Sequence, residues 1–566
     1  MRWRYFFIIF IFSALYLVLI SNLLNLQYFK KDFYIFQIES RNQLSGVLES
    51  ERGKIFITDK NNNKIEVALN KDYSIIYAVP KEIQQIVEQG GLRLAEGGLT
   101  TRIYAEQLSQ IIGDSADNLE KKFNKQEDEY ELLAQKASGQ QLEQIKNLNL
   151  KGIYFRKNNA RFYPSEKLAS HLLGFVSPAD DKETVKYGNV QLGRYGIESK
   201  FNLFLTGEAG EFNDGKIIRK PEKGKDLFLT IDRNIQAQSE DVLGKLIEKW
   251  GASSGSIIVQ EPSTGKILAM ANEPNFNPND YSQFDIKNFL NPSVEAIYEP
   301  GSVFKIITMA AGIDSGKITP ETSYVDTGSV TINGRTIKNW DLKAHGKLTM
   351  MNVIEKSINT GTIFAERTMG HDVFSDYLNK FGFNEITGID LPGEVRGDIS
   401  HLKKGKDVDF ATASFGQGVA ITPIQLISAA SAIANGGILM KPLLLADDKP
   451  KVIRRVISED TAKKVSAMMV SAVKKNIIAD IPNYEIAGKT GTAYIPNFNV
   501  GGYTDEVIHS YVGFAPASNP RFVILMKLEK PRALLAGETV VPIFKELTQY
   551  LLNYYNIAPD GLTASQ

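Results

Sequence analysis

The chain has 566 residues, which is too long for one ordinary hydrophobic core, so we expect two or three domains. Lys plus Arg and Asp plus Glu both number 65, and this zero net charge gives no electrostatic footprint for nucleic acid. The chain contains no Cys, which excludes disulfide scaffolds, thiolate metal sites and cysteine nucleophiles.

An uncharged, strongly apolar segment lies near the N-terminus, over residues 5–29, and it follows Arg2 and Arg4. A helix of about 20 such residues spans the hydrocarbon core of a bilayer. We therefore expect residues 1–26 to form a short cytoplasmic tail and one transmembrane anchor, with the rest of the chain outside the cytoplasm. A cleaved signal peptide is the alternative, but the segment is longer than a usual h-region and has no clear A-x-A site.

Residues 27–225 have the mixed pattern of strands, helices and polar turns, and we expect them to form a domain of their own. Residues 52–68 predict two strands around an Asn-rich turn. Residues 115–150 are rich in Glu, Lys, Gln and Leu, and their apolar spacing predicts packed helices with an exposed face. A charged linker is the alternative for this last stretch.

From residue 226 the pattern changes to that of an antiparallel sheet with helices packed on it. Residues 227–231 predict a strand, and Asp232 is placed to cap a helix over 233–250. Next come a hairpin made of 256–260 and 266–271, helices over 303–314, 349–369, 422–435, 459–474 and 541–555, and strands near 484–494, 508–515 and 521–528. This order favours an α+β domain over 226–558, followed by a flexible tail at 559–566.

A candidate nucleophile comes from the pattern S-x-x-K. On a helix this spacing puts Ser and Lys on one face, where a neutral Lys can take the Ser proton. The pattern is weak alone, because four copies occur, at Ser263, Ser302, Ser400 and Ser471. Ser302 follows Pro300–Gly301 and opens an apolar run, so it lies at a helix N-terminus, where free N–H groups favour an oxyanion. A plain helix N-cap is the alternative for Ser302.

A second element is Lys489-Thr490-Gly491-Thr492, the only K-[ST]-G in the chain. As a strand it places Lys489 and Gly491 on one face and the two Thr residues on the other. A Gly in a strand lets another backbone or a ligand come close, and a Lys beside two hydroxyls suits a carboxylate. A phosphate-binding loop is excluded, because Asn483 stands where that loop requires Gly.

A third element is Ser357-Ile358-Asn359, for which a polar turn after a helix is the alternative. The three elements together are far more specific than each one alone. Their order, with Ser302 and Lys305 first, Ser357 and Asn359 second and Lys489 last, resembles the penicillin-binding proteins and serine β-lactamases.

The resemblance is specifically to class B penicillin-binding proteins, and it covers essentially all of residues 226–555. It rests on Tyr298–Lys305, on Leu229–Asp232 with Gln236, and on Pro262-x-Thr264-Gly265, Thr387–Glu394, Phe415–Gly418 and Val512–Pro516. The N-terminal part is similar to the pedestal domain of the same class at Arg52-Gly53, Arg161-x-Tyr163-Pro164, Leu173–Val176 and Gly196–Glu198. It departs from that pattern at Glu166, where Gly is usual, and at Asp59, which lies two residues later than expected.

The resemblance implies a serine β-lactamase/penicillin-binding transpeptidase fold, which is an antiparallel sheet with flanking and all-helical subdomains. An elongated mixed α/β pedestal would precede it, after the anchor. It also implies roles for the site residues. Ser302 would be acylated, Lys305 would be its base, Ser357 would relay a proton and Asn359 would orient the substrate. Lys489 would supply positive potential, Thr490 and Thr492 would hold a carboxylate beside Gly491, and the N–H groups of Ser302 and Thr492 would form the oxyanion hole.

The implied activity is that of a peptidoglycan D,D-transpeptidase that cross-links stem peptides and is inhibited by β-lactams. A D,D-carboxypeptidase, a β-lactamase and a non-catalytic sensor or scaffold are the alternatives. No cofactor or metal is expected, since the five His residues (171, 345, 371, 401 and 509) show no ligand spacing. The implied place is the bacterial cytoplasmic membrane, single-pass, with the catalytic domain outside. The implied partners are a membrane-embedded glycosyltransferase and other division or elongation proteins, with division favoured.

Overall fold

The computed structural model describes residues 47–48, 50–88, 100–125, 128–179, 191–213, 216–497 and 500–560. The predicted anchor at residues 1–26 lies outside these ranges. Within them, no helix combines the length and the apolar character that crossing a membrane requires. The described residues divide into two compact units, one with those that fall within Met1–Gly53 and Leu203–Asp226 and the other with those within Lys54–Asn202 and Leu227–Gln566.

The smaller unit contains a three-stranded antiparallel sheet with the order β1-β8-β9. Its strands are β1 (Val47–Leu48), β8 (Gly210–Asn213) and β9 (Lys216–Arg219).

The larger unit contains a sheet in which β3 (Lys64–Ala78) is the long central strand. It pairs with β2 (Ile55–Thr58), β4 (Glu131–Ala137) and β5 (Ile153–Phe162), and β10 (Leu227–Asp232) lies parallel to β2. The predicted hairpin over 52–68 is confirmed. Its turn is fixed by Asp59, whose carboxylate accepts the N–H groups of Asn61 and Asn63 at 2.8 and 3.0 Å.

One prediction in this region is partly wrong. Residues 115–150 form helices α5 (Ala116–Phe123) and α6 (Gly139–Leu148), but β4 lies between them. The β4 residues are mostly good helix formers, so local propensity favoured a helix. Pairing with Ser74–Ala78 of β3 overrides it, and Leu133 and Ala137 join the core formed with α3 (Pro80–Glu88) and α4 (Thr100–Ile112).

The short elements that follow are α7 (Ser170–Leu173), β6 (Phe175–Pro178), β7 (Gln191–Arg194), α9 (Gly196–Lys200) and α10 (Asn202–Thr206). A buried ion pair joins β5 to α9, in which Arg161 Nε donates to Glu198 Oε1 at 2.6 Å. Nearby, Glu166 has φ 50°, a left-handed conformation that Gly adopts without strain. A left-handed backbone at position 166 explains why Gly is the usual residue there in the class that this chain resembles.

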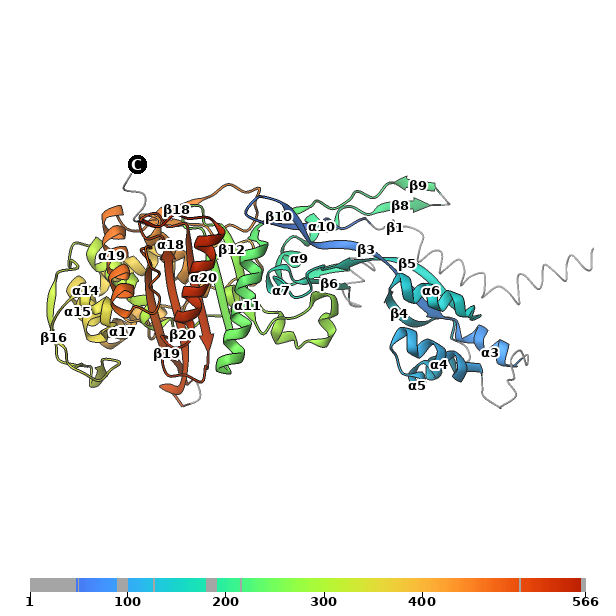
Figure 1. The fold of residues 1–566 in the computed structure, drawn as a ribbon, viewed down its shortest axis with the longest axis horizontal. Helices are drawn as coiled ribbons and strands as arrows, with labels where there is room; N and C mark the ends of the chain where they lie inside the picture. Colours follow the sequence, from blue (N-terminus) through green and yellow to red (C-terminus); the bar gives the residue numbers. More distant parts are fainter. Residues whose placement is uncertain are drawn as a thin grey trace, which may run out of the picture. The chain divides into compact units, whose positions relative to one another are not determined.

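The C-terminal half of the larger unit is built on a five-stranded antiparallel sheet with the order β12-β11-β21-β20-β19. The strands are β11 (Ser254–Gln260), β12 (Ile267–Glu273), β19 (Ala487–Pro496), β20 (Tyr503–Ala515) and β21 (Phe522–Glu529), which confirms every strand predicted after residue 250. Helices α11 (Arg233–Trp250) and α20 (Val540–Tyr554) cover one face (Figure 1) and share an apolar core with it. Asp232 caps α11 as predicted.

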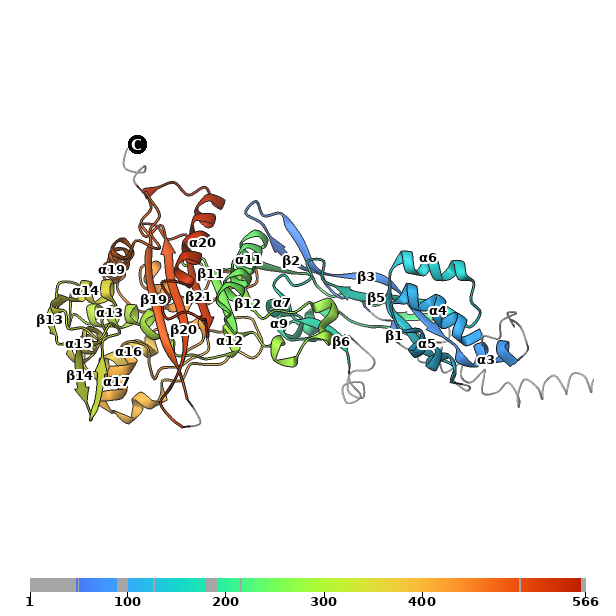
Figure 2. The same cartoon turned by 60° about the horizontal axis from the view of Figure 1, so that its bottom comes forward.

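Between β12 and β19 lies a predominantly helical segment, in which η2 contacts β6, whereas α13 to α17 are seen on the left in Figure 2. Its helices are η2 (Pro278–Gln283), η3 (Ile286–Phe289), α12 (Pro292–Glu295), η4 (Gly301–Phe304), α13 (Lys305–Asp314), α14 (Met350–Lys356), α15 (Asn359–Met369), α16 (His371–Lys380), η5 (Ser400–Lys404), α17 (Asp407–Ala413), α18 (Pro423–Ala434) and α19 (Glu459–Asn476). Its strands form three small hairpin-like pairs: β13 (Ser323–Asp326) with β16 (Gly346–Thr349), β14 (Ser329–Ile332) with β15 (Arg335–Lys338), and β17 (Ile438–Met440) with β18 (Val452–Arg455).

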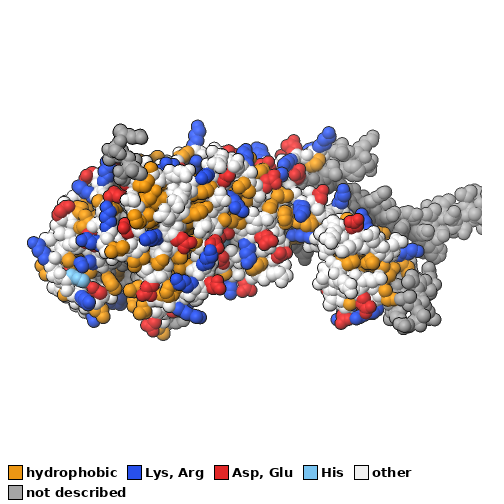
Figure 3. Space-filling model, in the orientation of Figure 1, with side chains coloured by type: hydrophobic (Ala, Val, Ile, Leu, Met, Phe, Trp, Pro, Cys, Tyr) orange, Lys and Arg blue, Asp and Glu red, His pale blue; other side chains and the backbone are white. Residues whose placement is uncertain are grey.

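The single helix predicted over 349–369 is two helices, because Ser357 has a left-handed backbone (φ 56°) and ends α14. Residues 561–566 of the predicted tail lie outside the described residues, and the Asp560 carboxylate accepts the Glu485 N–H at 2.6 Å. On the face seen in Figure 3, Lys and Arg side chains are interspersed with Asp and Glu, and no large field of one sign is visible.

Candidate active site

Ser302 lies in the 3-10 turn η4, directly before α13. The residues at the N-cap positions of η4 and α13 are Pro300 and Phe304, and neither position carries a side-chain cap. In the described part of the chain, Ser302 Oγ forms no hydrogen bond. The N-cap alternative for Ser302 is therefore wrong, and its half-buried hydroxyl is committed to no structural partner.

Two glycines let this turn lie against the edge strand β19. A Cβ on Gly491 would lie 2.3 Å from Ser510 Oγ and 2.9 Å from the Pro300 carbonyl oxygen. A Cβ on Gly301, which has φ 62°, would lie 2.9 Å from the Thr492 carbonyl oxygen. The close backbone approach predicted at Gly491 is thus confirmed, and it brings Ser302 next to Thr492.

Lys305 is fully buried and turns its ammonium group toward the S-x-N segment. Lys305 Nζ donates to the Ser357 carbonyl oxygen at 2.6 Å and to Asn359 Oδ1 at 2.8 Å, and it lies 3.4 Å from Ser357 Oγ. The first and second motifs, which are about 50 residues apart in sequence, are therefore in direct contact.

Lys489 contacts the same hydroxyl. Its Nζ donates to Ser357 Oγ at 2.9 Å and to the Thr490 carbonyl oxygen at 3.0 Å, and its side chain is nearly fully buried. Ser357 Oγ thus lies between Lys305 Nζ and Lys489 Nζ. This hydroxyl joins all three sequence motifs.

The charge state of the two lysines follows from burial. Burial lowers the pKa of Lys305 well below its ordinary value, and the nearby charge of Lys489 lowers it further. Burial also lowers the pKa of Lys489, to about 7. A neutral Lys305 beside a hydroxyl network has the properties of a general base.

Asn359 has both ends of its amide engaged. Its Oδ1 accepts from Lys305, and its Nδ2 donates to the Lys338 carbonyl oxygen at 2.9 Å. This second contact was not predicted, because a main-chain carbonyl contributed from a distant hairpin leaves no signal in the sequence. It fixes which way the amide of Asn359 points.

Burial alternates along β19 as predicted. Lys489 and Gly491 are buried, whereas Thr490 and Thr492 are half-buried. Across the ladder, Thr492 pairs with His509 of β20. The His509 ring is buried and its Nδ1 contacts Thr539 Oγ1 at 2.9 Å, and burial lowers its pKa to about 4. His509 is therefore a neutral residue that backs the strand at Thr492.

The other S-x-x-K copies have structural surroundings. Ser471 Oγ donates to Glu355 from within α19, Ser263 lies in the turn between β11 and β12, and Ser400 begins η5. No cluster of three metal-ligating side chains occurs among the described residues.

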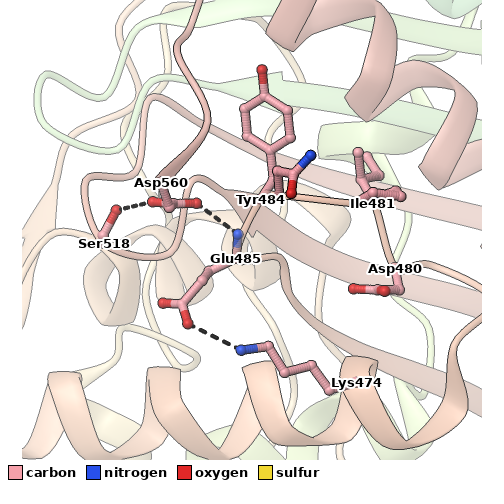
Figure 4. A pocket seen from close by; sticks show the side chains of 9 residues that line it. Lys474, Asp480, Ile481, Tyr484, Glu485, Ser518 and Asp560 are labelled. Atoms are coloured by element: carbon pink, nitrogen blue, oxygen red, sulfur yellow. Dashed lines mark hydrogen bonds and ion pairs between the residues drawn. The ribbon is translucent and has the colours of Figure 1, made fainter. Parts of the chain in front are cut away.

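A pocket of about 640 Å³ lies elsewhere, where the C-terminal segment packs against the residues that lead into β19 (Figure 4). Asp560 lies within reach of both Ser518 and the Glu485 backbone there, and Lys474 pairs with Glu485 at 3.1 Å. None of the predicted site residues lines this pocket.

Comparisons with known proteins agree with this geometry. The family described as "Penicillin binding protein transpeptidase domain" matches residues 255–549, and "Penicillin-binding Protein dimerisation domain" matches residues 47–229. A "Probable peptidoglycan D,D-transpeptidase PbpC" of Pseudomonas aeruginosa is 30% identical, over 100% of this chain and 97% of its own length.

The "Peptidoglycan D,D-transpeptidase FtsI" of Escherichia coli K12 is 29% identical, over 95% of this chain and 89% of its own. Among solved structures, penicillin-binding protein 3 of Mycobacterium tuberculosis, complexed with aztreonam, is similar with a TM-score of 0.68. It is 26% identical, over 91% of this chain and 98% of that one.

Proposed function

The chain belongs to the class B penicillin-binding transpeptidases, and from this premise we propose that it cross-links peptidoglycan stem peptides through an acyl-enzyme on Ser302. The observation that carries this assignment is the position of Ser357 Oγ, 2.9 Å from Lys489 Nζ and 3.4 Å from Lys305 Nζ. It brings a base, a proton relay and a cationic group to one point, and the base Lys305 follows the uncommitted Ser302 by three residues.

In the first half-reaction, Ser302 Oγ attacks the carbonyl carbon between the two terminal D-alanines and gives its proton to neutral Lys305. N–H groups of Ser302 and Thr492 stabilise the oxyanion that forms, which is the largest electrostatic contribution expected for this step. The C–N bond then breaks. Lys305 returns the proton through Ser357 to the leaving nitrogen. D-Ala therefore leaves with a neutral amine, and Ser302 holds the rest of the peptide as an ester.

In the second half-reaction, an amine of a neighbouring stem peptide attacks the ester carbonyl. Its proton passes to Lys305, the C–O bond to Ser302 breaks, and Ser302 Oγ takes that proton back. Lys489, with the hydroxyls of Thr490 and Thr492, would hold the terminal carboxylate of the donor peptide. A β-lactam would acylate Ser302 in the same way and remain there.

We further propose a single N-terminal anchor within residues 1–26, a pedestal over 27–225 and a transpeptidase domain over 226–558, with the catalytic part outside the cytoplasmic membrane. A membrane-embedded glycosyltransferase would supply the glycan strands. A division role is favoured by the Leu173–Val176 segment together with the similarity to E. coli FtsI. The uncharged segment at residues 5–29 supports the anchor.

Labelling with a fluorescent penicillin tests the nucleophile. Wild type should gain one covalent penicillin, by gel fluorescence and intact mass, and Ser302→Ala should gain none. Ser263→Ala is the matched control, because Ser263 begins another S-x-x-K but lies exposed in a turn, and it should label like wild type. Equal labelling of wild type and Ser302→Ala would overturn the assignment.

A second assay separates cross-linking from hydrolysis on the same scaffold. The enzyme is given lipid-linked peptidoglycan and a glycosyltransferase, and the muropeptides are separated by mass. Cross-linked dimers that disappear with Ser302→Ala are the expected result. Products shortened by one D-Ala, without dimers, would identify a carboxypeptidase instead.

A further inference from the structure

A buried carboxylate outside the three motifs lies close behind the S-x-N segment. Asp326 ends β13 and is only 2% exposed. Its Oδ1 accepts the Gly328 N–H at 3.0 Å and the Thr360 hydroxyl at 2.7 Å, and its Oδ2 accepts the His345 N–H at 2.9 Å. The Asn339 side chain donates to both oxygens, at 3.0 and 2.9 Å. The cost of burying this charge is thus offset by four donor groups.

These donors come from three separate segments of the chain. Gly328 and Asn339 flank the β14–β15 hairpin at its two ends, and His345 immediately precedes β16. Thr360 lies in the first turn of α15, where the partial positive charge of the helix N-terminus also favours an anion. Asp326 therefore ties the hairpin region to the beginning of α15.

The direction of the hydrogen bonds within this cluster is determined by chemistry. A carboxylate only accepts, so the Thr360 hydroxyl proton points at Asp326. Tyr324, whose oxygen lies 3.1 Å from Thr360 Oγ1, must then donate to Thr360. Burial raises the pKa of Asp326, but the hydrogen bonds from Thr360, Gly328, Asn339 and His345 outweigh it and lower that pKa below its ordinary value. Asp326 is ionised at neutral pH.

The two segments that Asp326 joins are the two that hold Asn359. Thr360 follows Asn359 directly, and Asn339 follows Lys338, whose carbonyl accepts from Asn359 Nδ2 at 2.9 Å. Asn339 Oδ1 also accepts the Thr360 N–H at 3.2 Å. A shift of either segment would change the position of the Asn359 amide, and with it the 2.8 Å contact between Asn359 Oδ1 and Lys305 Nζ.

We propose that Asp326 is a positioning residue for acylation, which holds the Asn359 amide in register with Lys305 by joining the β14–β15 hairpin to α15. It touches no substrate itself. This proposal rests on the assigned roles of Ser302, Lys305 and Asn359. Its alternative is a purely structural role, in which Asp326 stabilises the fold and leaves the reacting groups unaffected.

The experiment measures the non-covalent affinity for a penicillin and the first-order acylation rate constant separately, by stopped-flow or timed labelling. Asp326→Ala, or the milder Asp326→Asn if the first variant does not fold, should lower the rate constant about 10- to 100-fold, since a misplacement of ~1 Å can cost about 100-fold. The affinity should change little. Glu394→Gln is the matched control, because the Glu394 carboxylate accepts the backbone N–H groups of Thr387 and Gly388 in another loop. It should keep the wild-type rate constant.

A double-mutant cycle then asks whether Asp326 acts through Asn359. Asn359→Ala will itself be slow, so its labelling is followed over hours. In the Asn359→Ala background, the Asp326 substitution should lower the acylation rate constant by less than a further threefold. Two results would overturn the proposal. One is a further loss of about 10- to 100-fold in the rate constant in that background, and the other is a folded Asp326 variant whose rate constant is within twofold of wild type. These outcomes are separate from a failure of the assigned function, in which wild type would not be labelled on Ser302 at all.

Discussion

Two buried lysines share the hydroxyl of Ser357, and this arrangement makes the charge of one lysine depend on that of the other. Burial has the larger effect in lowering the pKa of Lys305, and Lys489 in its protonated form lowers it further, because it disfavours a second positive charge nearby. Lys489 therefore has a part in making the base as well as in attracting an anionic ligand. The two contributions can be separated by pH.

Replacing Lys489 with Gln removes the repelling charge, so the pKa of Lys305 should rise. The acid limb of the acylation pH profile should then move to higher pH, in addition to a lower rate at every pH. Second-order labelling rates between about pH 5 and pH 10 measure this shift. Lys474→Gln, at an exposed lysine paired with Glu485, is the control and should leave the profile unchanged. An acid limb that stays in place, or moves down, contradicts the coupling.

At this scale the sequence identified the candidate reacting groups and Asn359, but not the groups that hold Asn359 in place. Ser302, Lys305, Ser357 and Lys489 were recognisable because each belongs to a short pattern with a chemical reason for its spacing. Asp326 and the Lys338 carbonyl have no such pattern. Their importance comes from contacts between segments that only the folded chain brings together.

At the scale of elements, η4 can lie against β19 because Gly301 and Gly491 have no side chain at the point of contact. Gly491 faces Ser510 and the Pro300 carbonyl so closely that a methyl group would meet both. This fit holds η4, the turn that carries Ser302, at the sheet edge.

Gly491→Ala should push η4 away from the strand and lower the acylation rate constant about 100-fold or more. The overpacking should also lower the free energy of unfolding by about 1–3 kcal/mol. Labelling kinetics and chemical denaturation measure the two effects. Gly244→Ala in α11 is the control, because a Cβ there meets nothing within 4 Å, and it should stabilise the protein by about 0.5–1 kcal/mol. Normal acylation by Gly491→Ala would show that the close approach is dispensable.

Element boundaries show where local reasoning was sufficient and where it was not. The capped helix after Asp232 and the strands of the main sheet were predictable, since periodicity and caps are local signals. The strand β4 was not, because its residues favour a helix and only pairing with β3 makes it extended. The break at Ser357 comes from a left-handed residue, and the sequence offered a polar turn there only as an alternative to the continuous helical pattern.

For the whole molecule, the proposed anchor can be tested on the full chain. The protein should remain with membranes after washing in alkaline carbonate, and protease added outside spheroplasts should digest it. A variant lacking residues 1–26, exported by a cleavable signal, should be released in soluble form and should still label with penicillin. An N-terminus found by sequencing to lie beyond residue 26 in the native protein would show that the segment is a cleaved signal instead.

The main sheet is assembled from both ends of its domain, and this has a consequence for how the protein is made. Strand β11 ends at Gln260, but its neighbour β21 begins only at Phe522. Since synthesis proceeds from the N-terminus, the edge of β11 that pairs with β21 has no partner until nearly all of the chain has been made. An exposed strand edge invites aggregation, and such distant pairing folds slowly. We therefore expect the newly made chain to need protection of this strand edge, and a nonsense codon before Phe522 removes β21, the strand that joins β20 and β19 to β11 and β12.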